Sequence, residues 1–266
     1  MDPSSQDGAF RRPAAPEETV RANRAWWDDQ AAEYLAEHGD FLGAADLVWG
    51  PEGLREEQAR LLGDLRGRRV LEIGAGAAQG SKYVADQGGL VVATDLSSAM
   101  LRSGGDTAPY VPVLTCDARR LPFADQSFDV VFTAQGALPF VADPELLVAE
   151  AARVLRPGGR FVAATPHPIR WAFPDSPDER GLTATMSYFD RTPYVEITGG
   201  VTSYVEHHRT VGDRIRDLMT AGFMLLDLVE PEWPDGHDLI WGGWSPTRGR
   251  LLPGTAIYVA ELLRPT

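Results

Sequence analysis

The sequence predicts an α/β protein with a mostly parallel β-sheet and helices on both faces. Short apolar runs typical of buried strands alternate with helical segments through the middle of the chain. Glycines and acidic residues directly follow several of these runs, as expected where loops meet at one edge of a parallel sheet. The length of 266 residues fits one such domain with insertions, or one domain plus a small cap.

The core elements follow one another in a regular order. Apolar runs predict strands at residues 70–73, 90–95, 111–116, 128–133 and 160–165. Helices are predicted at residues 81–87, 97–103 and 143–155, the last beginning at Asp143-Pro144. We therefore assign the core of the domain to residues 67–165.

The N-terminal part divides into a tail and a helical lid. Residues 1–18 are polar and rich in proline and alanine, which predicts a disordered tail. Residues 19–37 form a predicted helix with an aromatic stripe of Trp26, Trp27 and Tyr34, and residues 51–64 form a second. Because the stripe is too apolar for a free surface helix, residues 19–66 are expected to cover the core, with Tyr34 facing a ligand.

The C-terminal part, residues 166–266, completes the domain and inserts a cap over about 166–209. Residues 193–198 and 201–209 predict a β-hairpin turning at Gly199-Gly200. A helix at 210–221 and strands at 223–229 and 254–262 follow. The connection at residues 230–253 exceeds the usual loop length, which suggests a binding role.

Composition narrows the functional classes. The net charge of −13 argues against nucleic acid as a partner. The single cysteine, Cys116, permits no internal disulfide and fits a reducing compartment, so we expect a cytoplasmic protein. No run of about 18 apolar residues predicts a membrane span. Both a monomer and a homodimer are compatible with the sequence.

A ligand site is predicted at the ends of the first three strands. In the segment from Glu72 to Gln79, Gly74 and Gly76 allow close approach of a ligand to the backbone, and the next helix points its free N–H groups there. Glu72 suits a ligand with an ammonium group, and Asp95 suits the two hydroxyls of a ribose. Asp117 is placed to accept from an adenine amino group; alternatively, it caps the following turn.

Two longer motifs are more specific. Leu121-Pro-Phe-Ala-Asp-Gln-Ser-Phe-Asp129 and Arg153-Val-Leu-Arg-Pro-Gly-Gly-Arg160, together with the site above, resemble the class I S-adenosylmethionine (SAM)-dependent methyltransferases. The resemblance covers residues 70–165 and is closest to the ubiquinone/menaquinone-biosynthesis type that acts on small molecules. Segments outside this stretch, such as Trp26-Trp-Asp-x-x-Ala-x-x-Tyr34, resemble actinobacterial methyltransferase-like proteins whose substrate is unknown.

The resemblance implies a Rossmann-like, seven-stranded sheet whose last strand is antiparallel, with SAM as cofactor and S-adenosylhomocysteine as product. It also implies roles for individual residues. The residues expected to bind the cofactor are Tyr34, Glu72, Gly74, Ala75, Gly76, Gln79, Asp95, Leu96, Met100, Asp117, Ala118 and Gln135. In the family the third position of the glycine loop is often glycine, and here it is Ala78.

The expected reaction is methyl transfer to oxygen, nitrogen or carbon of a small molecule by in-line displacement at the sulfonium. A base assists when the nucleophile is a hydroxyl, and histidine is the usual one. His167 follows the fifth predicted strand at the ligand edge. His207 and His208 are adjacent on a strand and point to opposite faces, so at most one faces a pocket. A reaction without a protein base is the remaining alternative.

The acceptor pocket is expected in residues 166–253, with an aromatic wall. The candidates are Arg170, Trp171, Tyr188, Trp233 and Trp241, whose alternative role is packing within a small cap. Arg170, Arg191 and Arg209 would hold a carboxylate or phosphate of the acceptor. The histidine spacings of a metal site are missing, so we expect no metal.

Two other functions remain open at this point. A nicotinamide-dependent oxidoreductase shares the fold, but the third glycine of its Gly-x-Gly-x-x-Gly loop is Gln79 here. The second of these functions is a binding protein that has the SAM fold but catalyses no reaction. The intact set of Glu72, Asp95 and Asp117 argues against it.

Overall fold

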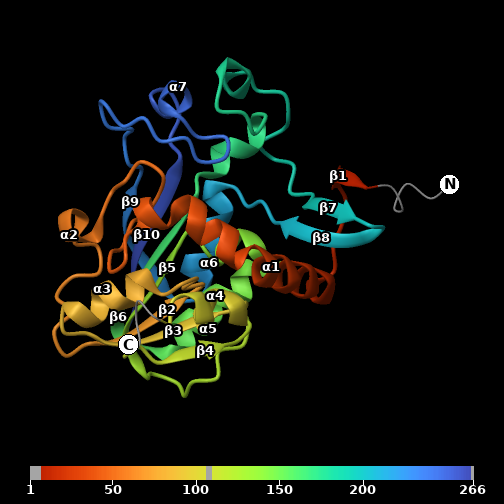
Figure 1. Ribbon diagram of the computed structural model, residues 1–266. Coiled ribbons are helices and arrows are strands. Elements are labelled where there is room, and N and C mark those ends of the chain that lie inside the picture. Colours follow the sequence, from red (N-terminus) through yellow and green to blue (C-terminus); the bar gives the residue numbers. More distant parts are fainter. Residues whose placement is uncertain (1–6, 106–109, 265–266) are drawn as a thin grey trace.

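The computed structural model describes residues 7–105 and 110–264. Within them, a large sheet has the strand order β4-β3-β2-β5-β6-β10-β9 (Figure 1). Its strands are β2 (Arg69–Ile73), β3 (Leu90–Asp95), β4 (Val113–Thr115), β5 (Phe128–Ala134), β6 (Leu155–Pro166), β9 (Phe223–Val229) and β10 (Thr255–Leu262). Only β10 runs antiparallel to its neighbours. The predicted seven-stranded α/β fold is confirmed.

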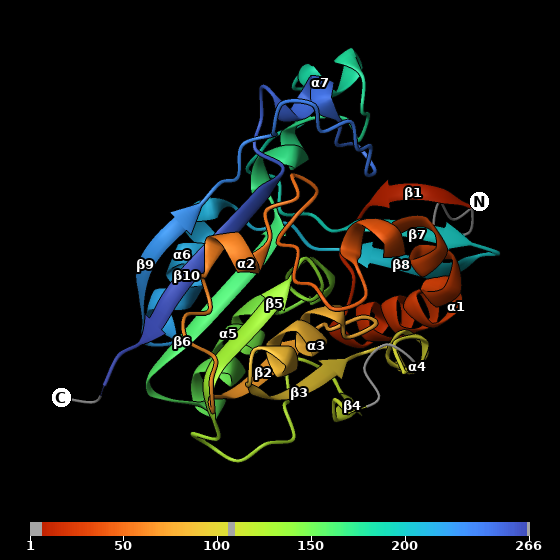
Figure 2. The same cartoon turned by 60° about the vertical axis from the view of Figure 1, so that its left-hand side comes forward.

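Helices cover both faces of the large sheet (Figure 2). Val70 and Phe132 point to one face, where α3 (Gln79–Asp86) and α4 (Ser98–Ser103) pack. Leu71 and Val131 point to the other, against α5 (Pro144–Val154) and α6 (Val211–Thr220). Successive strand residues alternate in direction, so central strands that are apolar throughout contribute to both halves of the core.

The helix α1 (Pro16–Leu42) is longer than predicted and begins within the predicted tail. It crosses the carboxyl-terminal edge of the large sheet (Figure 1). The predicted helix at 51–64 is reduced to α2 (Glu56–Ala59). The Glu56 carboxylate accepts the N–H groups of Leu61 and Leu62, which bends the chain where a longer helix would continue.

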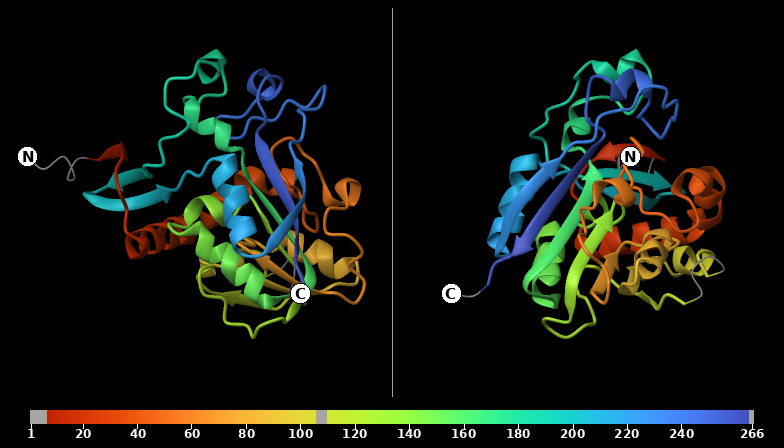
Figure 3. Two further views of the ribbon diagram at one scale, coloured as in Figure 1. Left: turned by 180° about the vertical axis from the view of Figure 1, so that it is seen from behind. Right: turned by 90° about the vertical axis from the view of Figure 1, so that its left-hand side faces the viewer.

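A small sheet lies apart from the large one (Figure 3). It has the order β1-β7-β8 and consists of β1 (Gly8–Arg11), β7 (Tyr194–Thr198) and β8 (Val201–Glu206). The predicted hairpin is confirmed as β7 and β8. The predicted disordered tail is wrong for Gly8–Arg11, because these residues pair with the open edge of β7. Residues 1–6 of that tail lie outside the described residues.

Three short segments lie above the carboxyl-terminal edge: η3 (Pro168–Ala172), η4 (Glu179–Leu182) and α7 (Pro246–Gly249). Arg248 of α7 is fully buried. It donates to the carbonyls of Pro174 and Gly243, and its guanidinium lies 4.3 Å from the centre of the Trp244 ring. Arg248 thus joins the two long C-terminal loops. No helix in the described part of the chain has the length and hydropathy needed to span a bilayer.

Candidate active site

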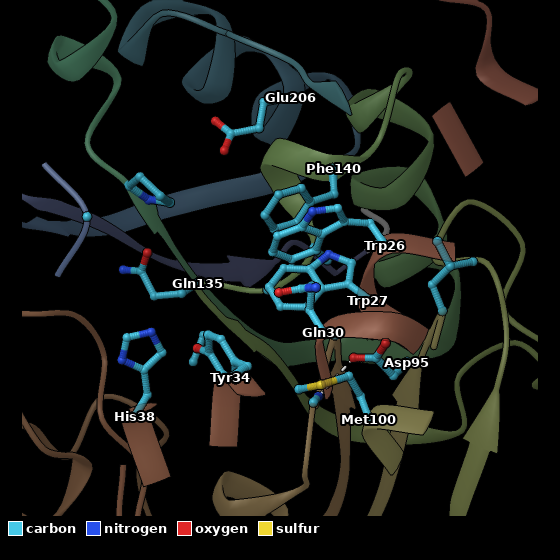
Figure 4. A pocket seen from close by; sticks show the side chains of 18 of the residues that line it. Trp26, Trp27, Gln30, Tyr34, His38, Asp95, Met100, Gln135, Phe140 and Glu206 are labelled. Atoms are coloured by element: carbon cyan, nitrogen blue, oxygen red, sulfur yellow. Dashed lines mark hydrogen bonds between the residues drawn. The ribbon is translucent and has the colours of Figure 1, made fainter. Parts of the chain in front are cut away.

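A cavity of about 940 Å³ lies at the carboxyl-terminal edge of the large sheet. Its floor is formed by the loops after β2, β3, β4 and β5, and α1 and the small sheet supply further walls (Figure 4). A cavity of this volume is at the upper end of the range for small-molecule sites. It therefore has room for a cofactor and a second small molecule.

The glycine loop after β2 approaches the loop after β5 closely. Gly74 has φ +70°, and a Cβ on Gly136 would lie 2.3 Å from the Gly74 carbonyl oxygen. The close approach of the two backbone segments therefore requires glycine at both positions, whether or not a ligand contacts them. Ala78, at the third position of the loop, has φ +61° and begins α3. An alanine in this conformation costs on the order of 1 kcal/mol, which explains why glycine is common there in the family.

The Asp95 carboxylate is held in place by the backbone at the end of β3. Gly76 N–H donates to its Oδ2 and Ser97 N–H donates to its Oδ1, both at 2.8 Å. Burial raises the pKa of Asp95, and these N–H groups oppose that shift. The carboxylate faces the cavity, so it is oriented before any ligand arrives (Figure 4).

The helix α1 is anchored beside this carboxylate. Asp28 accepts hydrogen bonds from Ser97 Oγ at 2.7 Å and from Ala99 N–H at 2.9 Å. Asp28 therefore supplies a carboxylate to the N-terminus of α4, an arrangement that helix N-termini favour. The link fixes α1 directly over the strand end that carries Asp95.

Glu72 is the most buried carboxylate of the glycine-loop region, at 4% exposed. Ser81 Oγ donates to its Oε2 at 2.5 Å. Burial raises the pKa of Glu72 to about 8. The side chain is thus mostly neutral at pH 7, and a bound ammonium group would favour its ionised form.

The raised pKa of Glu72 predicts a pH-dependent stability of the ligand-free protein. The folded pKa of about 8 lies above the ordinary value of 4.5, so this stabilisation is complete below pH 4.5 and is lost as the pH rises toward 8. Glu72→Gln keeps an acceptor for Ser81 and does not titrate. Between pH 6 and 8, we expect the free energy of unfolding of wild type to fall by roughly 2 kcal/mol relative to the variant. Urea denaturation at both pH values measures this; parallel changes in the two proteins would contradict it.

Asp117 fits both of its predicted roles. Its carboxylate accepts from the backbone N–H of Arg119 at 2.9 Å and from the Arg119 Nη2 at 2.8 Å, which caps the turn. Burial opposes its charge, but these Arg119 contacts lower the pKa of Asp117. The residue also lines the cavity beside Ala118. An ionised carboxylate in this position retains lone pairs for a ligand donor.

Tyr34 from α1 and Gln135 from the end of β5 both line the cavity (Figure 4). Gln135 has φ +63°, a strained conformation for a residue other than glycine, and its amide nitrogen donates to the Trp49 carbonyl at 2.9 Å. All the residues predicted to bind the cofactor line this cavity: Tyr34, Glu72, Gly74, Ala75, Gly76, Gln79, Asp95, Leu96, Met100, Asp117, Ala118 and Gln135.

The histidines predicted as bases lie elsewhere. His167, His207 and His208 are buried and do not line the cavity. His167 accepts from Ile169 N–H through Nδ1 and contacts Glu230 at 2.8 Å through Nε2. His207 bonds Thr19 Oγ1, and His208 donates to the Tyr188 carbonyl. These contacts engage each ring outside the cavity. They argue against the expectation that one of these three histidines is the base.

His38 is the histidine that lines the cavity, and sequence reasoning did not select it. Its ring stacks on Trp241 with centroids 4.0 Å apart and meets the Tyr34 ring edge-on at 4.7 Å. Burial lowers the pKa of His38, so the ring is neutral at pH 7. The signal in the sequence was its position one turn after Tyr34 on the same helix face.

The structure places only some of the residues predicted to bind the acceptor at the cavity. Arg170, Trp171 and Trp241 line the cavity, whereas Tyr188 and Trp233 do not. The Tyr188 hydroxyl accepts from Val211 N–H at the start of α6. Trp233 donates to the His237 carbonyl and packs against Gly249. Both side chains stabilise the cap.

Arg191 and Arg209, predicted with Arg170 to hold an anion, also lie outside the cavity. Arg191 is ion-paired with Asp213 at 2.6 Å, and Arg209 is 3.5 Å from the Glu145 carboxylate. These two guanidinium groups are therefore engaged in pairs outside the cavity.

The end of the cavity under the small sheet, here called the acceptor end, carries charged and aromatic groups. Arg170 Nη1 lies 2.7 Å from Glu206 Oε2, and the Tyr204 hydroxyl donates to Glu206 Oε1. Burial opposes the charge of Arg170, but Glu206 and Asp175 hold its pKa above the ordinary value. Burial and Glu206 both raise the pKa of Tyr204. The arginine is thus cationic and the phenol keeps its proton.

An aromatic wall connects the two ends. Trp26 lies 4.9 Å from Tyr204 and 4.6 Å from Trp27, and Trp27 lies 5.4 Å from Phe140, between ring centroids. In Figure 4 the rings of Trp26, Trp27 and Phe140 lie between Glu206 and the pair of Asp95 and Met100. Trp26 and Trp27 of the predicted aromatic stripe therefore line the cavity as well as Tyr34.

Comparison with known proteins agrees with this site. A family model described as a methyltransferase domain matches residues 71–163. Demethylmenaquinone methyltransferase of Beutenbergia cavernae is 33% identical over 194 residues, covering 72% of this chain and 74% of that protein. The enzyme of the same name from Mycobacterium tuberculosis is 32% identical over 203 residues, covering 75% and 76%.

Solved structures share the fold. A SAM-dependent methyltransferase from Mesorhizobium loti has a TM-score of 0.64 and 27% identity, covering 80% of this chain and 100% of that one. The Burkholderia thailandensis 1,6-didemethyltoxoflavin-N1-methyltransferase, bound to 1,6-didemethyltoxoflavin and S-adenosylhomocysteine, has a TM-score of 0.61 and 19% identity, covering 98% and 97%.

The fold, the cavity and these matches define a SAM-dependent methyltransferase that acts on a small-molecule acceptor. The chain belongs to the class I methyltransferases, of the menaquinone-biosynthesis-like type.

Proposed function

We propose that SAM binds along the floor of the cavity and that the acceptor binds beneath the small sheet. The observation that carries this is a single cavity joining the predicted cofactor residues to an aromatic-walled second end. SAM supplies the activated methyl group. The chain holds the two molecules together and excludes water from between them.

In this proposal the cofactor contacts follow from the geometry of the strand ends. Asp95 accepts the ribose hydroxyls, Leu96 and Met100 flank the adenine, and Asp117 accepts from its amino group. Glu72 faces the ammonium group of the methionine part, with Gly74 and Gly76 allowing close approach. Tyr34 and Gln135 complete the methionine end from opposite sides.

The helix α1 acts as the lid over this site. It is tied to α4 by Asp28 and reaches the cavity with Trp26, Trp27, Tyr34 and His38. Because α1 forms so much of the cavity wall, it excludes water only while it is packed against the rest of the protein.

The acceptor is proposed to be a small aromatic molecule. The named relatives act on demethylmenaquinone, and the wall of Trp26, Trp27 and Phe140 suits a flat ring in this chain as well. The formal charge of −13 favours such a molecule over nucleic acid. A cytoplasmic location agrees with the free thiol of Cys116.

The test is transfer of labelled methyl. Purified protein is incubated with SAM carrying a tritiated methyl group and fractions of a small-molecule extract, with demethylmenaquinone as one defined acceptor. Label is expected in one or a few aromatic compounds and is expected to disappear with Asp95→Ala. Tight S-adenosylhomocysteine binding without transfer to any fraction would instead favour a binding protein, and absence of both would overturn the proposal.

His38 is proposed to receive the acceptor's proton. It is neutral at pH 7, and the nearest carboxylate to its ring among the described ion pairs is Glu37, whose Oε2 lies 3.8 Å from Nε2, beyond hydrogen-bond distance. With the acceptor identified above, His38→Gln is expected to lower kcat by about 100-fold, the lower range for loss of a general base. Its affinity for S-adenosylhomocysteine should stay near wild type.

The matched control is His237→Gln, since His237 bonds the Pro51 carbonyl and does not line the cavity. The control should leave kcat within about threefold of wild type, because surface or loop contacts contribute little to turnover. Equal losses in the two variants, or an unchanged kcat and pH profile in His38→Gln, would refute the role of His38.

A further inference from the structure

The charges at the acceptor end indicate which acceptors fit. Arg11 and Arg170 are the guanidinium groups that line it, against the carboxylates of Asp175, Glu196 and Glu206. The local balance is therefore negative. An anionic acceptor would meet more like charge than opposite charge here.

Both guanidinium groups are already engaged. Arg170 pairs with Glu206 at 2.7 Å and lies 3.7 Å from Asp175. Arg11 donates to the Thr192 carbonyl at 2.9 Å, and its guanidinium lies 4.4 Å from the centre of the Trp171 ring. An anion that recruited Arg170 would leave the Glu206 carboxylate, which is 8% exposed, without its cation.

The two tyrosine hydroxyls at this end already donate within the protein, so they can only accept a hydrogen bond from a ligand. The Tyr204 hydroxyl donates a hydrogen bond to Glu206, and the Tyr194 hydroxyl donates one to Glu196 at 2.8 Å. Each carboxylate oxygen of Glu206 carries one hydrogen bond, from Tyr204 or from Arg170, and can accept another. Lone pairs on both oxygens of Glu206 are therefore available to a donor group of a ligand at this end.

We propose that Glu206 is a specificity residue that accepts a hydrogen bond from an amino or hydroxyl group on an aromatic acceptor. The assignment rests on the proposed function, because the acceptor must lie beside SAM. A neutral or cationic donor group adds a partner to Glu206 and leaves its pair with Arg170 intact. Carboxylate and phosphate acceptors are discriminated against, contrary to the expectation from Arg170 in the sequence.

The experiment uses the complex with S-adenosylhomocysteine and matched fragments. One series contains phenethylamine, phenol and phenylacetate; the other contains tryptamine, 5-hydroxyindole and indole-3-acetate. Dissociation constants come from ligand-observed NMR titration. The amines and hydroxyl compounds are expected to bind at least about tenfold more tightly than the carboxylates, the scale of one charge-assisted hydrogen bond.

Glu206→Gln should reduce this preference to roughly threefold or less, with an unchanged affinity for S-adenosylhomocysteine. Glu145→Gln is the control: Glu145 also lies near an arginine, 3.5 Å from Arg209, but does not line the cavity. Tyr204→Phe removes the hydroxyl that orients Glu206 and should weaken the preference to a smaller extent. It provides a second measurement if Glu206→Gln does not fold.

Tighter binding of the carboxylates to wild type, or a preference unaffected by both variants, would overturn the assignment to Glu206. So would a titration in which no fragment of either series binds the wild-type complex. Failure of S-adenosylhomocysteine itself to bind would instead overturn the proposed function, so the two outcomes are distinguishable.

Discussion

Replacement of Asp95 by alanine is expected to weaken binding of S-adenosylhomocysteine by roughly 1.5–3 kcal/mol, or about 10- to 150-fold. In the proposed complex this carboxylate accepts both ribose hydroxyls. Its orientation is set in advance by the N–H groups of Gly76 and Ser97, so little ordering is needed on binding. The variant also leaves those two N–H groups without their acceptor. Isothermal titration calorimetry measures the loss.

Two further variants sharpen this result. Asp95→Asn keeps an oxygen for one backbone N–H and should show a smaller loss. Asp227→Ala removes an exposed carboxylate on β9, outside the cavity, and should bind like wild type. An affinity of Asp95→Ala within about twofold of wild type would contradict the assignment to the ribose, since that difference is below the value of a single hydrogen bond.

Asn23→Ala is expected to destabilise the protein by about 2–4 kcal/mol, the largest effect we expect on stability. Asn23 is fully buried, and its amide nitrogen donates to the Val205 carbonyl at 2.9 Å and the Phe140 carbonyl at 3.1 Å. Its oxygen accepts from Val205 N–H at 2.9 Å. The side chain thus pairs with the edge of β8 as a neighbouring strand would, and alanine leaves three buried groups unpaired.

Urea denaturation gives the loss in free energy, and hydrogen exchange shows where it occurs. Exchange should accelerate first in β8 and in the N-terminal half of α1. Arg21→Ala, an exposed position on the same helix, serves as the control and should change stability by less than about 0.5 kcal/mol. A variant as stable as wild type would show that α1 does not depend on this contact to hold the small sheet.

The residues that form the floor of the cavity could be predicted from the sequence because each of its determinants is local. Gly74, Asp95 and Asp117 each lie at the end of a strand or within two residues of it, and parallel strands bring such positions to one edge. The same reasoning missed β1, because its partner β7 lies far along the chain and its own residues carry no strand pattern. It also overextended α2, whose end depends on the buried carboxylate of Glu56.

The acceptor end was harder to predict for a related reason. The sequence shows that Arg170 lies near the active edge, but it does not show that Glu206 neutralises it. Likewise, the histidine nearest the predicted edge, His167, bonds to its own loop, while His38 reaches the cavity from a helix that crosses it. Side-chain pairing between distant segments is decided by tertiary packing.

The position of α1 connects the two ends of the cavity thermodynamically. Asp28 fixes the helix beside the cofactor floor, and Asn23 fixes it to the sheet above the acceptor. In the proposed complex, a molecule that steadies α1 at one end of the cavity is expected to steady a wall of the other end as well. Linkage requires such an effect to be reciprocal: the factor by which S-adenosylhomocysteine raises the affinity for an acceptor equals the factor by which that acceptor raises the affinity for S-adenosylhomocysteine. In the proposed complex, we therefore expect cofactor and acceptor to bind cooperatively through α1.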